Sequence, residues 1–231
     1  MKKYFGTLLL ISLISLGFNT IQAQEKENRT IGDFTKIEVS SGINLYITQG
    51  DEIDLLVESE KSELHKIITK VDNGTLRIYN KNSYNWGMKK APKVRLTFKE
   101  ISSISCNGGA DVYSQNTIKA ENLRVTTSGG ADAYLDVVCN DVSLKTSGGS
   151  DIKIKGTTKN LKASASGGSD IHANDLKALV VEVNTSGGAD ASVWAVESIS
   201  AKASGGGDID YHGNPKVKNI TESGGGDITQ K

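Results

Sequence analysis

The sequence predicts an all-β protein built as a parallel β-solenoid, and three observations lead to that fold class. A short string of two glycines followed by an aspartate occurs seven times, beginning at Asn107, Ser128, Ser147, Ser166, Ser186, Ser204 and Ser223. The intervals between copies are 21, 19, 19, 20, 18 and 19 residues, and a period near 19 with small drift is typical of stacked repeats. The chain contains 25 glycines but only two prolines, which favours a folded, turn-rich β protein.

The segments around each copy alternate apolar and polar residues with a period of two. The position three residues before the motif is apolar in every copy, as in Ile104, Val125 and Leu144. The residue directly after the aspartate is also always apolar, as in Val112 and Ile152. A period of two indicates strands with one buried face and excludes a helix. Each copy is therefore expected to hold a strand, a corner and a second strand, stacked on the next copy at ~4.8 Å.

The paired glycines are predicted to form the corners of the coils. Every coil of a solenoid turns sharply at the same place, and neighbouring coils crowd that corner. Glycine adopts positive φ at low cost and lets backbones approach each other closely. The expected corner residues are Gly108, Gly109, Gly129, Gly130, Gly148, Gly149, Gly167, Gly168, Gly187, Gly188, Gly205, Gly206, Gly224 and Gly225.

The aspartates of the motif should form one file along the stack. The favoured interpretation is a turn cap, because aspartate accepts backbone amide hydrogens in tight turns. Calcium along the file is the alternative, because carboxylates are suitable ligands, and its candidate residues are Asp132, Asp151, Asp170 and Asp190. Catalysis by paired carboxylates is disfavoured, because acid and base need different environments and a file repeats one environment. No metal or other cofactor is therefore expected.

The first 23 residues have the pattern of a cleaved signal peptide. Lys2 and Lys3 precede an apolar run from Leu8 to Phe18, and Ala23 offers a small residue for cleavage. We therefore expect an exported protein, in the periplasm or at the cell surface, without a transmembrane segment after cleavage. Residues 24–105 are expected to form a β-rich N-terminal cap, and residues 106–231 a solenoid of seven coils continuous with it. Asn73-Gly74, between two alternating runs, predicts a β-hairpin in the cap.

Several strings identify a resemblance to a known family. "SSGINLYITQG" around Gly42-Ile43-Asn44 is followed by "VDNGTLRIYN" and then by the Ser-Gly-Gly-x-Asp coils. In this order the motifs resemble the putative auto-transporter adhesin, head GIN domain family, over roughly residues 30–231. The resemblance implies a single-stranded right-handed β-helix in an exported protein with adhesin-like shape. It implies no functional residues.

Two groups of aromatic residues are candidates for ligand binding. Tyr84 and Trp86 lie in a loop beside lysines without a strand pattern that would bury them. Tyr113 and Tyr134 occupy the same outward position on neighbouring coils and should stand side by side. Burial of Trp86 under the cap and simple cross-strand stacking of the tyrosines are the structural alternatives, and both are favoured.

The function expected from these features is a non-enzymatic, adhesion-like module that binds a surface glycan or an envelope protein. The alternatives are a structural envelope protein that self-associates end to end through its last coil, and, least favoured, a carbohydrate-active β-helix enzyme. A formal net charge of zero gives no general attraction to nucleic acid. Cys106 and Cys139 differ in their position within the repeat, so we expect two separate, partly buried thiols rather than a disulfide.

Overall fold

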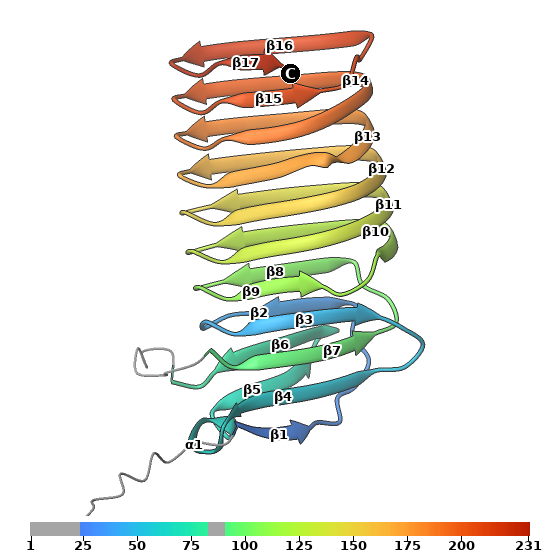
Figure 1. Cartoon of the computed structure of the whole chain (residues 1–231), viewed down its shortest axis with the longest axis vertical. Coiled ribbons are helices and arrows are strands. Elements are labelled where there is room, and N and C mark those ends of the chain that lie inside the picture. The colour runs from blue at the N-terminus through green and yellow to red at the C-terminus, as the bar shows by residue number, and fades with distance from the viewer. Residues whose placement is uncertain (1–23, 83–90) are drawn as a thin grey trace, which may run out of the picture.

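The structure is a computed structural model that describes residues 24–82 and 91–231, and nearly every element in these ranges is a β-strand (Figure 1). One four-residue helix, α1 (Lys61–Leu64), is the only helix of the described chain, so no described helix is long and apolar enough to cross a membrane. The strands form one hydrogen-bonded sheet wound into a stack of parallel coils. The solenoid predicted from the repeat is confirmed. The predicted signal peptide lies outside the described residues.

The regular coils run from β8 to β17 and consist of two walls joined at the glycine corners. Strands that run into a corner form wall 1, and strands that leave it form wall 2. The long strands bend and contribute to both walls. Neighbouring coils are in parallel register, so that Leu144 pairs with Val125 on one side and with Ala163 on the other. The strands are β8 (Ser103–Asn107), β9 (Asp111–Ser114), β10 (Ile118–Ser128), β11 (Asp132–Ser147), β12 (Asp151–Gly167), β13 (Asp170–Gly187), β14 (Ala191–Gly205), β15 (Ile209–His212), β16 (Val217–Gly224) and β17 (Ile228–Gln230).

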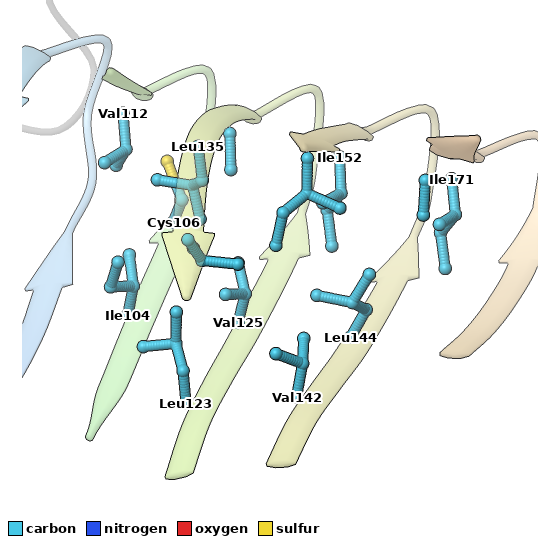
Figure 2. Packing of buried hydrophobic residues seen from close by; sticks show 14 of the residues in the cluster. Ile104, Cys106, Val112, Leu123, Val125, Leu135, Val142, Leu144, Ile152 and Ile171 are labelled. Atoms are coloured by element: carbon cyan, nitrogen blue, oxygen red, sulfur yellow. The ribbon is translucent and has the colours of Figure 1, made fainter. Parts of the chain in front are cut away.

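The interior of the coils is filled by the apolar residues that the alternation predicts. Ile104, Val125 and Leu144 follow one another along wall 1 and are at most 1% exposed. Figure 2 shows these side chains facing Val112 and Ile152 of wall 2 across the interior. Because every second residue of both walls is buried, the core is a continuous column that runs through the whole stack.

The glycine corners have the expected left-handed backbone, with a difference between the two glycines. The first glycine of each pair has positive φ in all seven corners, from 57° at Gly108 to 85° at Gly167. The second has positive φ only in the first three corners, at Gly109, Gly130 and Gly149. A Cβ atom on Gly205 would lie 2.9 Å from the carbonyl oxygen of the preceding corner. The first glycine is thus required both for its conformation and for the close approach of neighbouring corners.

The N-terminal segment contributes coils of its own, which the sequence analysis did not anticipate. Its strands are β1 (Gln24–Asn28), β2 (Lys36–Val39), β3 (Asn44–Gln49), β4 (Asp54–Glu60), β5 (Ile67–Asp72), β6 (Thr75–Asn80) and β7 (Lys93–Phe98). In parallel register, β2 lies between β6 and β8, and β3 lies between β7 and β9. The pairs β2–β3 and β6–β7 therefore stack beneath β8–β9, with the later pair farther from it (Figure 1). The boundary at residue 105 stays a prediction, but the segment before it is more than a cap.

The corner of the β2–β3 coil explains why this coil was missed. Val39 pairs with Cys106 and Asn44 pairs with Asp111, so Ser41 takes the place of the first glycine. Ser41 has a φ of 67°, a conformation that is uncommon outside glycine, and Gly42 follows with a φ of 68°. The Gly-Ile-Asn string is therefore an eighth corner of the same kind. A search for two adjacent glycines does not find it.

The end of the stack beyond β6–β7 is closed by antiparallel strands. β4 pairs antiparallel with β7 on one side and with β1 on the other, and β5 forms the predicted hairpin with β6. Asn73 and Gly74, with φ of 48° and 70°, make the turn of that hairpin. Leu55, Val57 and Phe98 are completely buried beneath these strands. The first coil therefore has no open interior.

Candidate functional site

The motif aspartates form the expected file at the start of wall 2, and each one accepts a hydrogen bond from the next coil. The backbone amide of Asp151 donates to Oδ1 of Asp132 at 3.0 Å, and that of Asp170 donates to Oδ1 of Asp151 at 3.2 Å. The same contact joins Asp190 to Asp170, Asp208 to Asp190, and Asp227 to Asp208. This geometry is that of the favoured turn-cap interpretation, with the cap extended from one coil to the next.

The calcium interpretation of the same file stays a prediction. Asp151, Asp170 and His172 bring one ligand atom each to within 4.8 Å of one another, in a position that is partly exposed. One oxygen of each of these two carboxylates is already occupied by a backbone amide. The cap role alone accounts for an aspartate in every coil.

Tyrosines form a second file, two residues further along wall 2. Tyr113 and Tyr134 stand side by side as expected, with ring centroids 5.0 Å apart and an interplanar angle of 3°. Tyr46 of β3 extends the stack, 5.2 Å from Tyr113. The hydroxyls of Tyr113 and Tyr134 donate to Oδ2 of Asp111 and Asp132. Each of these aspartates therefore binds the tyrosine of its own coil.

Burial governs the protonation of this pair of files. Burial, followed by the nearby charge of Asp111, raises the pKa of Tyr113 to about 12. Burial also raises the pKa of the Asp111 carboxyl, an effect opposed by the backbone amide of Asp132 and strengthened by the Asp132 charge. The tyrosines are thus neutral hydrogen-bond donors near neutral pH.

The three rings differ in how much of their faces is free. Tyr46 is covered on one side by the guanidinium of Arg95, 5.3 Å from its centroid, and on the other by Tyr113. Both faces of Tyr113 are covered by the other two tyrosines. Tyr134 is 39% exposed, and in the described part of the chain Tyr113 is the one ring stacked on it. Of the two tyrosines singled out in the sequence, only Tyr134 thus has a face that another ring could contact.

A groove of about 420 Å³ opens beside the free face of Tyr134. Its volume is within the range of small-molecule sites. Lys153, which pairs with Tyr134 in the next coil, lies on the other side of it. The remaining polar lining comes from Ser114, Gln115, Asn116, Asp136, Lys155 and Asp175.

One wall of the groove is an insertion in the repeat. Tyr113 pairs with Tyr134, and Ile118 pairs with Val137, so four residues of one coil face two of the next. The two extra residues account for the first interval of 21 instead of 19. The inserted loop carries Gln115 and Asn116 and projects beside the flat surface of β11 and β12.

Gln49 of β3 fixes this loop in place. Its backbone amide donates to Oδ1 of Asn116, and the side-chain amide of Asn116 donates to the carbonyl oxygen of Gln49 at 2.8 Å. The Gln49 side chain accepts from the amide of Lys119 and donates to the carbonyl oxygens of Lys99 and Lys119. The wall of the groove is therefore preorganised by hydrogen bonds that a ligand does not need to form.

The far side of the groove coincides with a second irregularity. His172 pairs with Lys153 and Asp175 pairs with Lys155, so β13 holds one residue more than β12 at this point. This bulge accounts for the interval of 20 residues between the fourth and fifth motifs. Bulges are common next to functional sites, where they redirect side chains. Here the bulge places Asp175 in the groove.

The remaining candidates are placed as follows. Tyr84 and Trp86 lie outside the described residues. Cys106 and Cys139 are both buried and unpaired, Cys106 on wall 1 and Cys139 on wall 2, as expected from their different positions in the repeat. Burial raises the pKa of both thiols, so they are inert side chains of the core.

Solved structures with the same architecture are known. A protein from Bacteroides fragilis described as a putative adhesin is 27% identical, with a TM-score of 0.86 over 91% of this chain and 98% of that one. A putative adhesin from Parabacteroides merdae is 16% identical, with a TM-score of 0.68 over 89% and 96% of the two chains. A protein from Parabacteroides distasonis described as a putative lipid binding protein is 21% identical, with a TM-score of 0.66 over 89% and 96%. The last two show the fold alone.

Comparison with protein families agrees with the resemblance that the motifs indicate. No curated protein matches the chain. The family model described as "Putative auto-transporter adhesin, head GIN domain" matches residues 33–215. This match covers the eighth corner around Gly42 and six of the seven glycine-aspartate corners. The chain therefore belongs to the head GIN domain family of putative auto-transporter adhesins.

Proposed function

We propose that the protein is an exported, non-enzymatic module that holds a surface ligand in the groove beside Tyr134. The observation that carries the proposal is the coincidence of this groove with both insertions in the repeat. A structure whose coils are otherwise close to uniform gains nothing in stability from a projecting loop and a bulge. Their position on either side of one exposed aromatic ring supports a binding role.

The chemistry of the groove favours binding over catalysis. Lys155 lies 3.4 Å from Asp136 and pairs its charge. The aspartates of the file share one environment, since each accepts the amide of the next coil, whereas a general acid and a general base require different environments. The names of the similar structures, adhesins and a lipid binding protein, agree with a non-enzymatic role.

Export is part of the proposal. The basic start, the apolar run and Ala23 are the pattern of a secretory leader, and the family is described by its likeness to adhesins. Within the exported compartments, the proposal covers both the periplasmic face of the envelope and the outer surface. In either place the ligand is a glycan or an envelope protein.

Binding of the labelled, exported protein to envelope fractions and to intact cells tests this function. We expect saturable binding that Tyr134→Ala reduces and that Tyr79→Ala leaves unchanged, since Tyr79 lies on β6 away from the groove. Retained melting temperatures for both variants are the control for folding. Equal binding by the wild type and Tyr134→Ala would show that the groove is not the site.

A further inference from the structure

We propose that the ligand of the groove is a neutral pyranose unit of a glycan, inserted between the ring of Tyr134 and the side chain of Lys153. The inference rests on the proposed function and deepens it. A pyranose has an apolar face of C–H groups and a rim of hydroxyls, each of which both donates and accepts. The groove offers a counterpart to each of these features.

The free face of Tyr134 suits the apolar side of a sugar ring. The opposite face is stacked on Tyr113, and the hydroxyl group donates to Asp132 at 3.4 Å, so the ring is supported from behind and at its edge. Arg95, Tyr46 and Tyr113 continue this support along the stack. A ring held in one orientation loses little conformational freedom when a ligand stacks on it.

The charges around the groove cancel. Two lysines, Lys153 and Lys155, face two aspartates, Asp136 and Asp175. Lys155 stands between the aspartates in register, and its contact with Asp136 is at the surface, where such pairs are worth at most about 1 kcal/mol. Vicinal hydroxyls can donate to the carboxylates and accept from the ammonium groups at the same time. An anionic or cationic sugar would instead leave one pair of charges unmatched.

Direct binding of saccharides tests the proposal. The probes are neutral hexose oligosaccharides, with uronate-containing and amino-sugar oligosaccharides of the same length, measured by NMR and titration calorimetry on the exported protein. We expect the neutral set to bind. Tyr134→Ala should weaken that binding by roughly 10-fold, the upper range for an aromatic contact, and Tyr134→Phe should bind within a few-fold of wild type. Lys145→Ala, an exposed lysine of wall 1, is the matched control for Lys153→Ala.

A second pair of variants separates ring stacking from damage to the fold. Asp175→Asn keeps the size of the side chain and should weaken neutral sugars without changing the melting temperature, because Asp175 lies in the bulge at the rim of the groove. Asp141→Asn, on wall 1, should have no effect on binding.

The outcomes distinguish this inference from the function beneath it. If envelope binding depends on Tyr134 but neutral sugars neither bind nor compete, the function stands and the sugar assignment is wrong. The assignment is also wrong if only uronate or amino sugars bind, or if Tyr134→Ala binds neutral sugars as the wild type does. If neither the envelope nor any saccharide binds, both proposals fail.

Discussion

The two ends of the stack are finished in different ways. At the N-terminal end, the antiparallel strands β1, β4 and β5 close the first coils, and Phe98 is completely buried among the core residues there. At the C-terminal end, β16 is the outer strand of wall 1, and all of its residues are exposed. One end has been covered by additional chain, whereas the other has been left at the surface.

The last coil substitutes charge for cover. Lys218, Ile220 and Glu222 pair with Ile199, Ala201 and Ala203, which are buried, so the positions that are apolar in β14 are mainly charged in β16. The Lys218 ammonium lies 2.8 Å from Oε1 of Gln230 and 5.4 Å from the centroid of the Tyr211 ring. Glu222 accepts the backbone amide of Ile228. Inward-pointing charges of this kind keep a strand edge from pairing with another chain.

The largest expected difference between the two ends concerns core packing. Phe98→Ala should lower the free energy of unfolding by about 3–5 kcal/mol, because it leaves a cavity in a fully buried site. Ile220→Ala, at a site 38% exposed, should cost less than about 1 kcal/mol. Urea denaturation of both variants measures the contrast. Similar losses would mean that the last coil is as well packed as the first.

A smaller effect is expected from the arginine that ties β1 to the rest of the cap. Arg29 donates to the carbonyl oxygens of Leu64 and Ile67, and its side chain is 14% exposed. Arg29→Ala should destabilise by about 2 kcal/mol, since it leaves buried carbonyl groups without their charged donor. Arg77→Ala is the matched control, because the Arg77–Glu38 pair is 45% and 40% exposed and should contribute little. Urea midpoints of the two variants would overturn this account if they were equal.

Acid should weaken the N-terminal end through Glu58, which is buried in β4. The hydrogen bond from Arg95, with the charge of Lys26, holds the Glu58 pKa below its ordinary 4.5, although burial opposes this. A lowered folded-state pKa gives stability that is present above pH 4.5 and is lost as the pH falls through the folded value. The stability gap between wild type and Glu58→Gln, of about 1 kcal/mol at neutral pH, should therefore close between pH 5 and about pH 3. A gap that is independent of pH would show that the ionised form is not the stabilising one.

The difference between the ends also explains which parts of the fold could be predicted from the sequence. The regular coils could be predicted because their register repeats in the sequence, so that one alignment of Val125 with Leu144 and Ala163 fixes the whole core. The N-terminal coils could not, because Ser41 replaces a glycine and the β6–β7 coil stacks outside β2–β3 against the order of the chain. Pairing between segments that lie far apart in sequence leaves no periodic signal.

The candidate site was predictable in part for the same reason. The stacking of Tyr113 and Tyr134 follows from their equal phase in the repeat, whereas Tyr46 and Gln49 belong to a coil that was not recognised. A signal for the groove was nevertheless present. The intervals of 21 and 20 residues mark the two coils whose extra residues form its walls. In a solenoid, departures from the period thus identify candidate sites more directly than the repeated residues do.

The smallest expected change in stability, and the sharpest test of the comparison, concerns the charges of the last coil. Lys218→Val with Glu222→Val restores apolar residues at inward positions and should alter the stability of the monomer by less than about 1 kcal/mol, since both sites are exposed. The same change should produce dimers at high protein concentration, measured by light scattering after size-exclusion chromatography, because an apolar, unpaired edge binds a second edge.

Asn219→Val with Thr221→Val is the matched control for that experiment, because these residues lie on the same strand but point outward, in register with Ser200 and Lys202. This variant should remain monomeric. If both double variants dimerise, added hydrophobicity alone is responsible. If the wild type already dimerises through β16, the charges do not terminate the stack. The self-associating envelope protein would then be favoured, since an end-to-end contact could pair Lys218 of one copy with Glu222 of the other. The two ends of the molecule would then differ in their partners, one covered by its own chain and the other by a second copy.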